Sequence, residues 1–84
     1  MERSFDMLNY KGEEAVEKIK VWFMFWYDSY TEDEVVNISK VAKDIRLGFN
    51  ATGHKPVVEI NKPDNKTEYL DLNQLTSIEI EYKD

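Results

Sequence analysis

Cysteine is absent from this 84-residue chain, which excludes disulfides, thiolate zinc sites, iron–sulfur clusters and cysteine nucleophiles. Histidine occurs once, as His54, so no second imidazole is available to complete a histidine pair at a metal or acid–base site. His54 lies between Gly53 and Pro56, and we expect it to be an exposed loop residue. No metal and no cofactor are therefore expected.

Basic residues are in the minority. The chain has 11 lysines and arginines against 17 aspartates and glutamates, which gives a net charge of −6 and a pI of about 4.7. This balance argues against direct binding of nucleic acid through a basic surface. The length predicts one domain, residues 1–84, with a single small core.

Long apolar segments are also missing. The longest run, residues 21–27, is far shorter than the roughly 20 residues that a membrane-spanning helix needs. Residues 1–6, Met-Glu-Arg-Ser-Phe-Asp, lack the basic and then apolar pattern of a secretory signal. We therefore expect a cytoplasmic protein, located in the host cytoplasm if it is viral, with no membrane partner.

Motifs for catalysis and for phosphate binding are not found. The glycine-containing segment 48–53 follows a predicted helix and precedes a predicted strand, which is the reverse of the order in phosphate-binding loops. No serine lies in a Gly-x-Ser-x-Gly context. We expect a protein that is not an enzyme.

One helix is predicted clearly, over residues 32–47. Thr31 and Glu34 have the spacing of a capping box, and Gly48 would supply the C-cap. Apolar residues recur along this segment at steps of three and four: Val35, Ile38, Val41, Ala42 and Ile45.

The C-terminal third has the alternation of strands. We predict strands over residues 56–61, 67–72 and 76–82, with turn residues at 62–66. These three strands would form an antiparallel meander with one apolar face and one acidic face.

The N-terminal part is ambiguous. Residues 17–27 fit a strand, with alternating apolar residues, but they also fit a helix; their β-branched and aromatic residues favour the strand. A first strand at 4–10 would precede it. The resulting order is ββαβββ, an α+β fold in which an antiparallel sheet of about five strands carries one helix on its apolar face.

The aromatic run at 22–27 suggests an interface. If the alternate residues Phe23, Phe25 and Tyr27 enter the core, an outward patch remains, made of Trp22, Met24 and Trp26. Exposed tryptophan and methionine are enriched at protein interfaces. The alternative is that a second layer of structure covers this patch.

Acidic residues dominate the outer face of the predicted C-terminal strands. Residues 56–84 carry seven acids against three lysines. The candidate partner-binding face comprises Glu59, Asp71, Glu79 and Glu81, with a second cluster formed by Asp28, Glu32, Asp33 and Glu34. Two simpler roles compete with binding: the face keeps the protein soluble, and acids at a helix N-terminus complement its dipole.

In size, acidity and lack of a catalytic motif, the chain is similar to the small inhibitors that phages and mobile elements make. That similarity is one of type and transfers no residues. We expect a non-catalytic DNA mimic whose anionic face engages a basic protein, such as a nucleoid protein or a nuclease. The alternative is a structural or regulatory subunit, or a homodimer, that associates through the aromatic patch.

Overall fold

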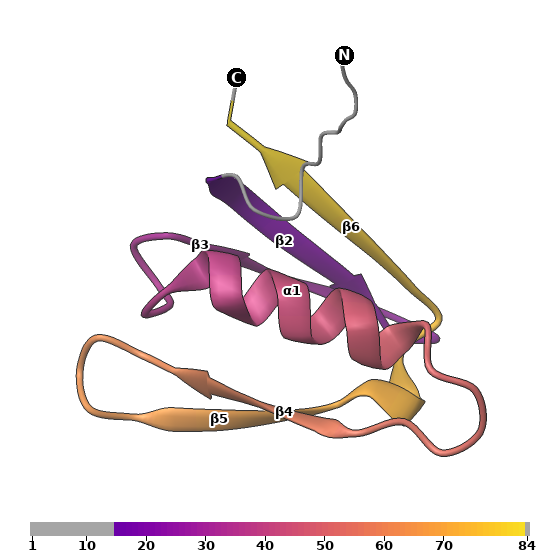
Figure 1. Cartoon of the computed structure of the whole chain (residues 1–84). Coiled ribbons are helices and arrows are strands. Elements are labelled where there is room, and N and C mark those ends of the chain that lie inside the picture. Colours follow the sequence, from indigo (N-terminus) through magenta and orange to yellow (C-terminus); the bar gives the residue numbers. More distant parts are fainter. Residues whose placement is uncertain (1–14, 84) are drawn as a thin grey trace, which may run out of the picture.

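The computed structural model describes residues 15–83 and shows a small α+β fold with the predicted order ββαβββ (Figure 1). The expected strand at 4–10 lies outside the described residues. The elements are β2 (Val16–Trp22), β3 (Tyr27–Thr31), α1 (Ile38–Phe49), β4 (Val57–Asn61), β5 (Thr67–Asp71), the 3-10 helix η2 (Leu72–Gln74) and β6 (Ser77–Tyr82).

The predicted strand at 17–27 is in fact most of a hairpin, and this part of the prediction is wrong. The chain reverses after Trp22, where the Phe23 amide donates to the Trp26 carbonyl at 2.7 Å. β2 and β3 then pair antiparallel, which places Ile19 opposite Tyr30. Both of these side chains are buried, so the reversal gives β2 a partner strand whose inner face also enters the core.

Within residues 15–83, the five strands form two sheets and not one. β3, β2 and β6 make a three-stranded sheet in the order β3-β2-β6, and β4 and β5 form a separate two-stranded sheet. The predicted meander is therefore wrong at its last step, because β6 joins β2 instead of β5. The cause is η2, whose buried Leu72 and following Leu75 carry the chain away from β5 toward the other sheet.

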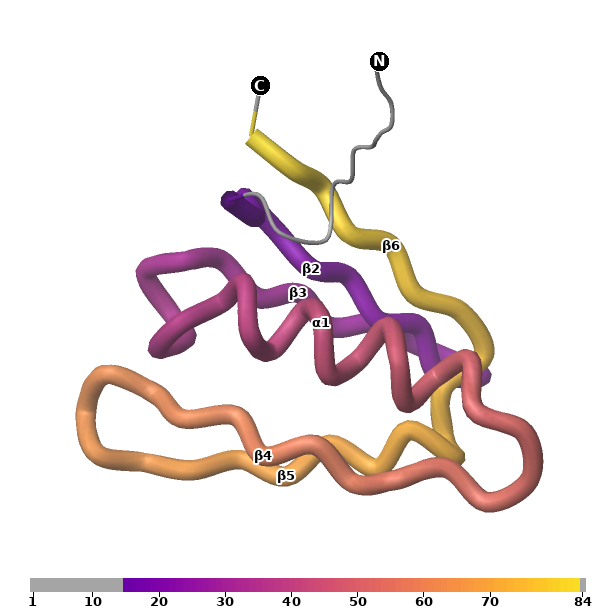
Figure 2. The backbone as a smooth tube through the Cα atoms, in the orientation of Figure 1, coloured from indigo at the N-terminus to yellow at the C-terminus, as the bar shows by residue number. Residues whose placement is uncertain are grey.

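Helix α1 lies between the two sheets, with the β3-β2-β6 sheet on one side and the β4-β5 hairpin on the other (Figures 1 and 2). Its buried residues are Ile38, Val41, Ala42, Ile45 and Gly48. The two sheets contribute buried residues from both sides, among them Ile19, Val21, Ile60 and Leu70. Within residues 15–83, no helix is long and apolar enough to cross a membrane.

The helix begins at Ile38, six residues later than predicted. Thr31 and Glu34 make one of the two contacts of a capping box, since the Thr31 amide donates to Glu34 Oε1 at 3.0 Å. The Glu34 amide donates to the Thr31 carbonyl at 2.9 Å, so these contacts close a turn. The Val36 amide then donates to the Asn61 carbonyl at 2.8 Å, which ties this segment to β4. Asn37, in the left-handed conformation with φ 55°, is the actual N-cap.

Gly48 is part of the helix and not its cap, because α1 continues to Phe49 and Asn50 occupies the C-cap. A Cβ atom at Gly48 would lie 2.5 Å from Leu72 Cδ1 and 2.8 Å from Pro56 Cγ. Leu72 is fully buried and the proline ring is rigid, so neither group can move aside easily. The glycine lets the helix approach η2 and the start of β4 closely.

We predict that Gly48→Ala lowers the free energy of unfolding by about 1–2 kcal/mol, because overpacking outweighs the roughly 1 kcal/mol by which alanine is the better helix former. Urea denaturation measures the change. Lys40→Ala is the control, since it removes an exposed ion pair with Asp44 on the same helix. It should lower the free energy of unfolding by no more than about 0.5 kcal/mol. A Gly48→Ala variant as stable as the wild type would show that the close approach is not needed.

Candidate functional site

Two turns come together at one end of the molecule. The turn from β3 into α1 and the turn from β4 into β5 lie at the same end, on the left in Figure 1, and the Val36–Asn61 hydrogen bond joins their bases. These turns and the adjoining parts of β3 and β5 carry six carboxylates, which we call the acidic end: Asp28, Glu32, Asp33, Glu34, Asp64 and Glu68. Four of the six were predicted as one cluster from the sequence.

An open cleft of about 410 Å³ lies between the two turns. Its walls come from β3 and from the β4-β5 hairpin. The lining residues are Asp28, Ser29, Tyr30, Glu34, Lys62, Pro63, Asp64 and Glu68. Four carboxylates against one lysine make the cleft negative, so it is suited to a cationic group.

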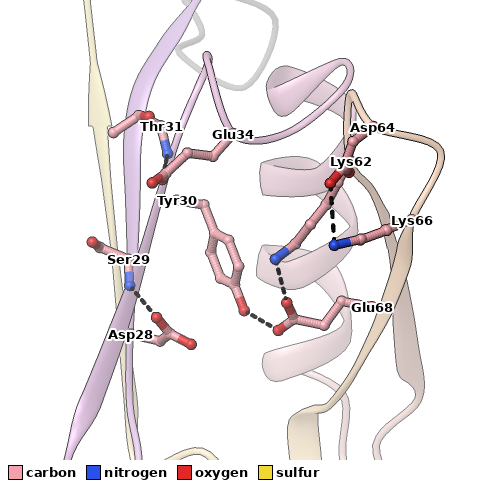
Figure 3. Close-up of polar contacts among 9 residues, drawn as sticks. All are labelled: Asp28, Ser29, Tyr30, Thr31, Glu34, Lys62, Asp64, Lys66 and Glu68. Atoms are coloured by element: carbon pink, nitrogen blue, oxygen red, sulfur yellow. Dashed lines mark hydrogen bonds and ion pairs between the residues drawn. The ribbon is translucent and has the colours of Figure 1, made fainter.

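Glu68 connects the two sheets at the floor of this cleft (Figure 3). The Tyr30 hydroxyl, from β3, donates to Glu68 Oε2 at 2.9 Å. Lys62 Nζ lies 2.9 Å from Glu68 Oε1. Tyr30 is buried and Glu68 is partly buried, so these charge-assisted contacts are shielded from solvent on one side.

Glu68, Lys62 and Tyr30 shift one another's pKa values. The Lys62 ammonium and the Tyr30 hydroxyl hold the pKa of Glu68 below its usual value, against the opposing effect of burial. Burial and the neighbouring Glu68 raise the pKa of Tyr30, and the hydrogen bond to Glu68 raises the pKa of Lys62. At neutral pH, Glu68 is therefore an anion, Lys62 a cation and Tyr30 a protonated hydrogen-bond donor.

Local contacts orient the other carboxylates of the cleft (Figure 3). Asp28 Oδ1 accepts from the Ser29 amide at 3.1 Å. Asp64 Oδ2 lies 3.4 Å from Lys66 Nζ, in an exposed ion pair. Outside the cleft, Lys83 Nζ contacts both carboxylate oxygens of Glu32, at 2.7 and 2.9 Å. The acidic end thus holds anions and a few lysines, with an excess of anions.

The predicted anionic row on β6 is not uniformly anionic. Glu79 lies opposite Lys20, and Glu81 lies opposite Lys18, on the outer face of the sheet. Each glutamate therefore has a lysine on the neighbouring strand. The sequence could not show this, because it did not determine which strand pairs with β6.

The remaining predicted acids belong to the other sheet. Glu59 and Asp71 lie on the outer face of the β4-β5 hairpin, away from Glu79 and Glu81. Asp71 also has a structural role, because it caps η2 by accepting from the Asn73 amide at 3.0 Å, and contacts with Asn73 lower its pKa. The eight predicted acids thus occupy three separate places.

The prediction of an exposed aromatic patch is only partly correct, because residues 23–26 form a turn and not a strand. Met24 and Trp26 are exposed as predicted, whereas Trp22 is half-buried. Phe25 and Tyr27 are exposed as well, so the condition that they enter the core with Phe23 is not met. We call the four exposed residues, Met24, Phe25, Trp26 and Tyr27, the aromatic tip; they form the turn between β2 and β3 and the first residue of β3.

His54 lies exposed in a bend between α1 and β4. In the part of the chain that the structure describes, no group of three or more histidine, aspartate or glutamate side chains is arranged to hold a metal ion. Comparisons with protein-family models, with curated proteins and with solved structures found no match.

Sequence reasoning missed the half of the cleft that comes from the β4-β5 hairpin. Lys62 and Asp64 were assigned only to a turn, and Glu68 only to a strand. Nothing local marks them as neighbours of Tyr30, which is 38 positions from Glu68. Only the position of the hairpin across the helix brings them together.

We predict that Tyr30→Phe lowers the free energy of unfolding by about 1–2 kcal/mol at neutral pH, because it removes a hydrogen bond to a charged, partly buried acceptor. Tyr69→Phe is the matched control, because Tyr69 is the neighbour of Glu68 in β5 but is exposed. Removal of its hydroxyl should lower the free energy of unfolding by less than about 0.5 kcal/mol. Urea denaturation compares the two variants.

The difference between Tyr30→Phe and the wild type should shrink in acid. Folding lowers the pKa of Glu68, so ionised Glu68 stabilises the fold at pH values above its usual pKa, near 4.5. This stabilisation is lost as the pH falls through the lowered pKa of the folded state. A cost of Tyr30→Phe that stayed the same well below that pH would contradict the assignment of Glu68 as a charged acceptor.

Proposed function

We propose that this chain is a non-catalytic binding protein that engages a basic surface of another protein through its acidic end. The observation that carries the proposal is the cleft lined by four carboxylates and one lysine, which stays negative after the Lys62–Glu68 and Lys66–Asp64 ion pairs are taken into account. A lysine or arginine side chain of a partner would meet several fixed negative charges there, which gives fast, steered association.

The carboxylates also come from rigid neighbours. Asp28 is on a strand, Glu68 is held by Tyr30 and Lys62, and Glu34 is held in a turn. A site whose groups are already oriented loses less conformational entropy when it binds. This supports a role in binding beyond simple solubility.

In its most specific form, the proposal is a DNA mimic that blocks a nucleic-acid-binding protein such as a nucleoid protein or a nuclease. The acidic end supports it better than the outer face of β6, where Lys18 and Lys20 oppose the two glutamates. The mimicry would rest on clustered charge and not on a regular row of charges. Charge complementarity of this kind weakens with salt.

The test is competition for a fluorescent duplex DNA bound to a histone-like bacterial nucleoid protein or to a non-specific nuclease made inactive by mutation. The wild type should displace the DNA, and Glu34→Lys with Asp64→Lys, two carboxylates that line the cleft, should weaken displacement by about tenfold or more, as expected for lost charge pairs. Both positions are exposed, so the fold should persist.

Glu79→Lys with Glu81→Lys is the matched control, because it changes the net charge by the same amount on another face. It should displace DNA nearly as well as the wild type. An equal loss in both variants would show that overall charge and not the acidic end decides binding. Failure of the wild type to displace DNA from either protein would reject the mimic.

A further inference from the structure

We propose that the chain forms a homodimer through its aromatic tip, so that the surface covering the tip is the tip of a second copy. Met24, Phe25, Trp26 and Tyr27 follow one another in the chain and are 75%, 90%, 56% and 59% exposed. Four consecutive exposed large apolar side chains on a monomer are typical of an interaction site.

A backbone hydrogen bond and two stacked ring pairs fix the conformation of the turn that carries the aromatic tip. The Phe23 amide donates to the Trp26 carbonyl at 2.7 Å, and the Phe23 and Trp26 rings stack with centroids 4.1 Å apart. Trp22 and Tyr27, paired across the hairpin, stack at 6.0 Å. Since these contacts already order Trp26 and Tyr27, association has fewer side chains of the tip to immobilise.

The surroundings of the tip favour a second copy as its partner. The Trp22 carbonyl accepts hydrogen bonds from the amide and hydroxyl of Thr76, so the segment before β6 lies beside the hairpin. Neither residues 21–27 nor residues 72–78 contain a charged side chain. Two molecules that each carry a net charge of −6 repel each other least when they meet at such an uncharged corner.

The available area is sufficient for a dimer. With about 150–250 Å² for each large side chain, the four residues expose roughly 500–600 Å². A two-fold contact uses the same patch on both copies, and complete coverage of the patch would bury up to about 1,000–1,200 Å² in total. That reaches the roughly 1,000 Å² which a specific interface needs.

The dimer uses a surface separate from the acidic end, and it responds to salt in the opposite direction. Salt weakens a contact between the acidic end and a basic partner. Salt should strengthen the dimer, or leave it unchanged, because it screens repulsion between two anionic molecules that meet through apolar groups. A negative result for the dimer therefore does not contradict the proposed binding through the acidic end, and the reverse also holds.

Sedimentation velocity over a range of micromolar concentrations tests the dimer, at low and at high salt. The wild-type mass should rise toward twice 10.0 kDa with concentration, and high salt should not weaken the association. Phe25→Lys should weaken it by about tenfold or more, as expected for a central aromatic contact. Because Phe25 is 90% exposed, the circular dichroism spectrum of this variant should match that of the wild type.

Tyr69→Lys is the control, since Tyr69 is also a largely exposed aromatic residue but lies on the outer face of the β4-β5 hairpin. It should dimerise like the wild type. A wild type that stays monomeric, or a dimer that Phe25→Lys leaves intact, would overturn the proposal. So would a monomer whose tryptophan emission shifts only when phosphatidylcholine vesicles are added, because the tip would then bind lipid.

Discussion

The burial of helix α1 on two sides is the constraint on which the rest of the molecule depends. The β4-β5 hairpin has only two strands, and an isolated two-stranded hairpin is marginally stable in water. It gains its stability by placing Val58, Ile60 and Leu70 against the helix, while the β3-β2-β6 sheet covers the other side. Gly48 allows the close approach that this three-layer arrangement requires.

The same arrangement decides where the charges lie. The helix lies between the two sheets, and the Tyr30–Glu68 hydrogen bond joins β3 to β5 near the end of the molecule where the two turns lie. Carboxylates from two distant segments are concentrated there. The turn between β2 and β3 instead carries apolar side chains. One small core therefore supports two surfaces of different chemistry. Salt should weaken binding through the acidic end but not association through the aromatic tip.

Local signals predicted the element types and long-range pairing caused the errors. The apolar steps of α1 and the alternation of β6 were visible because each repeats within one segment. The start of the helix was misplaced because the Val36–Asn61 hydrogen bond competes with it. The turn at residues 23–26 contains no glycine, proline or asparagine to mark it. The cleft could not be predicted because it depends on the β4-β5 hairpin lying where Glu68 reaches Tyr30, 38 positions away in the chain.

A titration of the isotope-labelled protein with a short oligo-arginine peptide, followed by the backbone amide signals, tests directly whether the acidic end is the binding surface. We predict that the largest shifts occur at residues 28–34 and 62–68, with little change along β6, and that added salt reverses them. Shifts that centre on Glu79 and Glu81, or that spread evenly over all acidic residues, would contradict the claim that the acidic end is the binding surface.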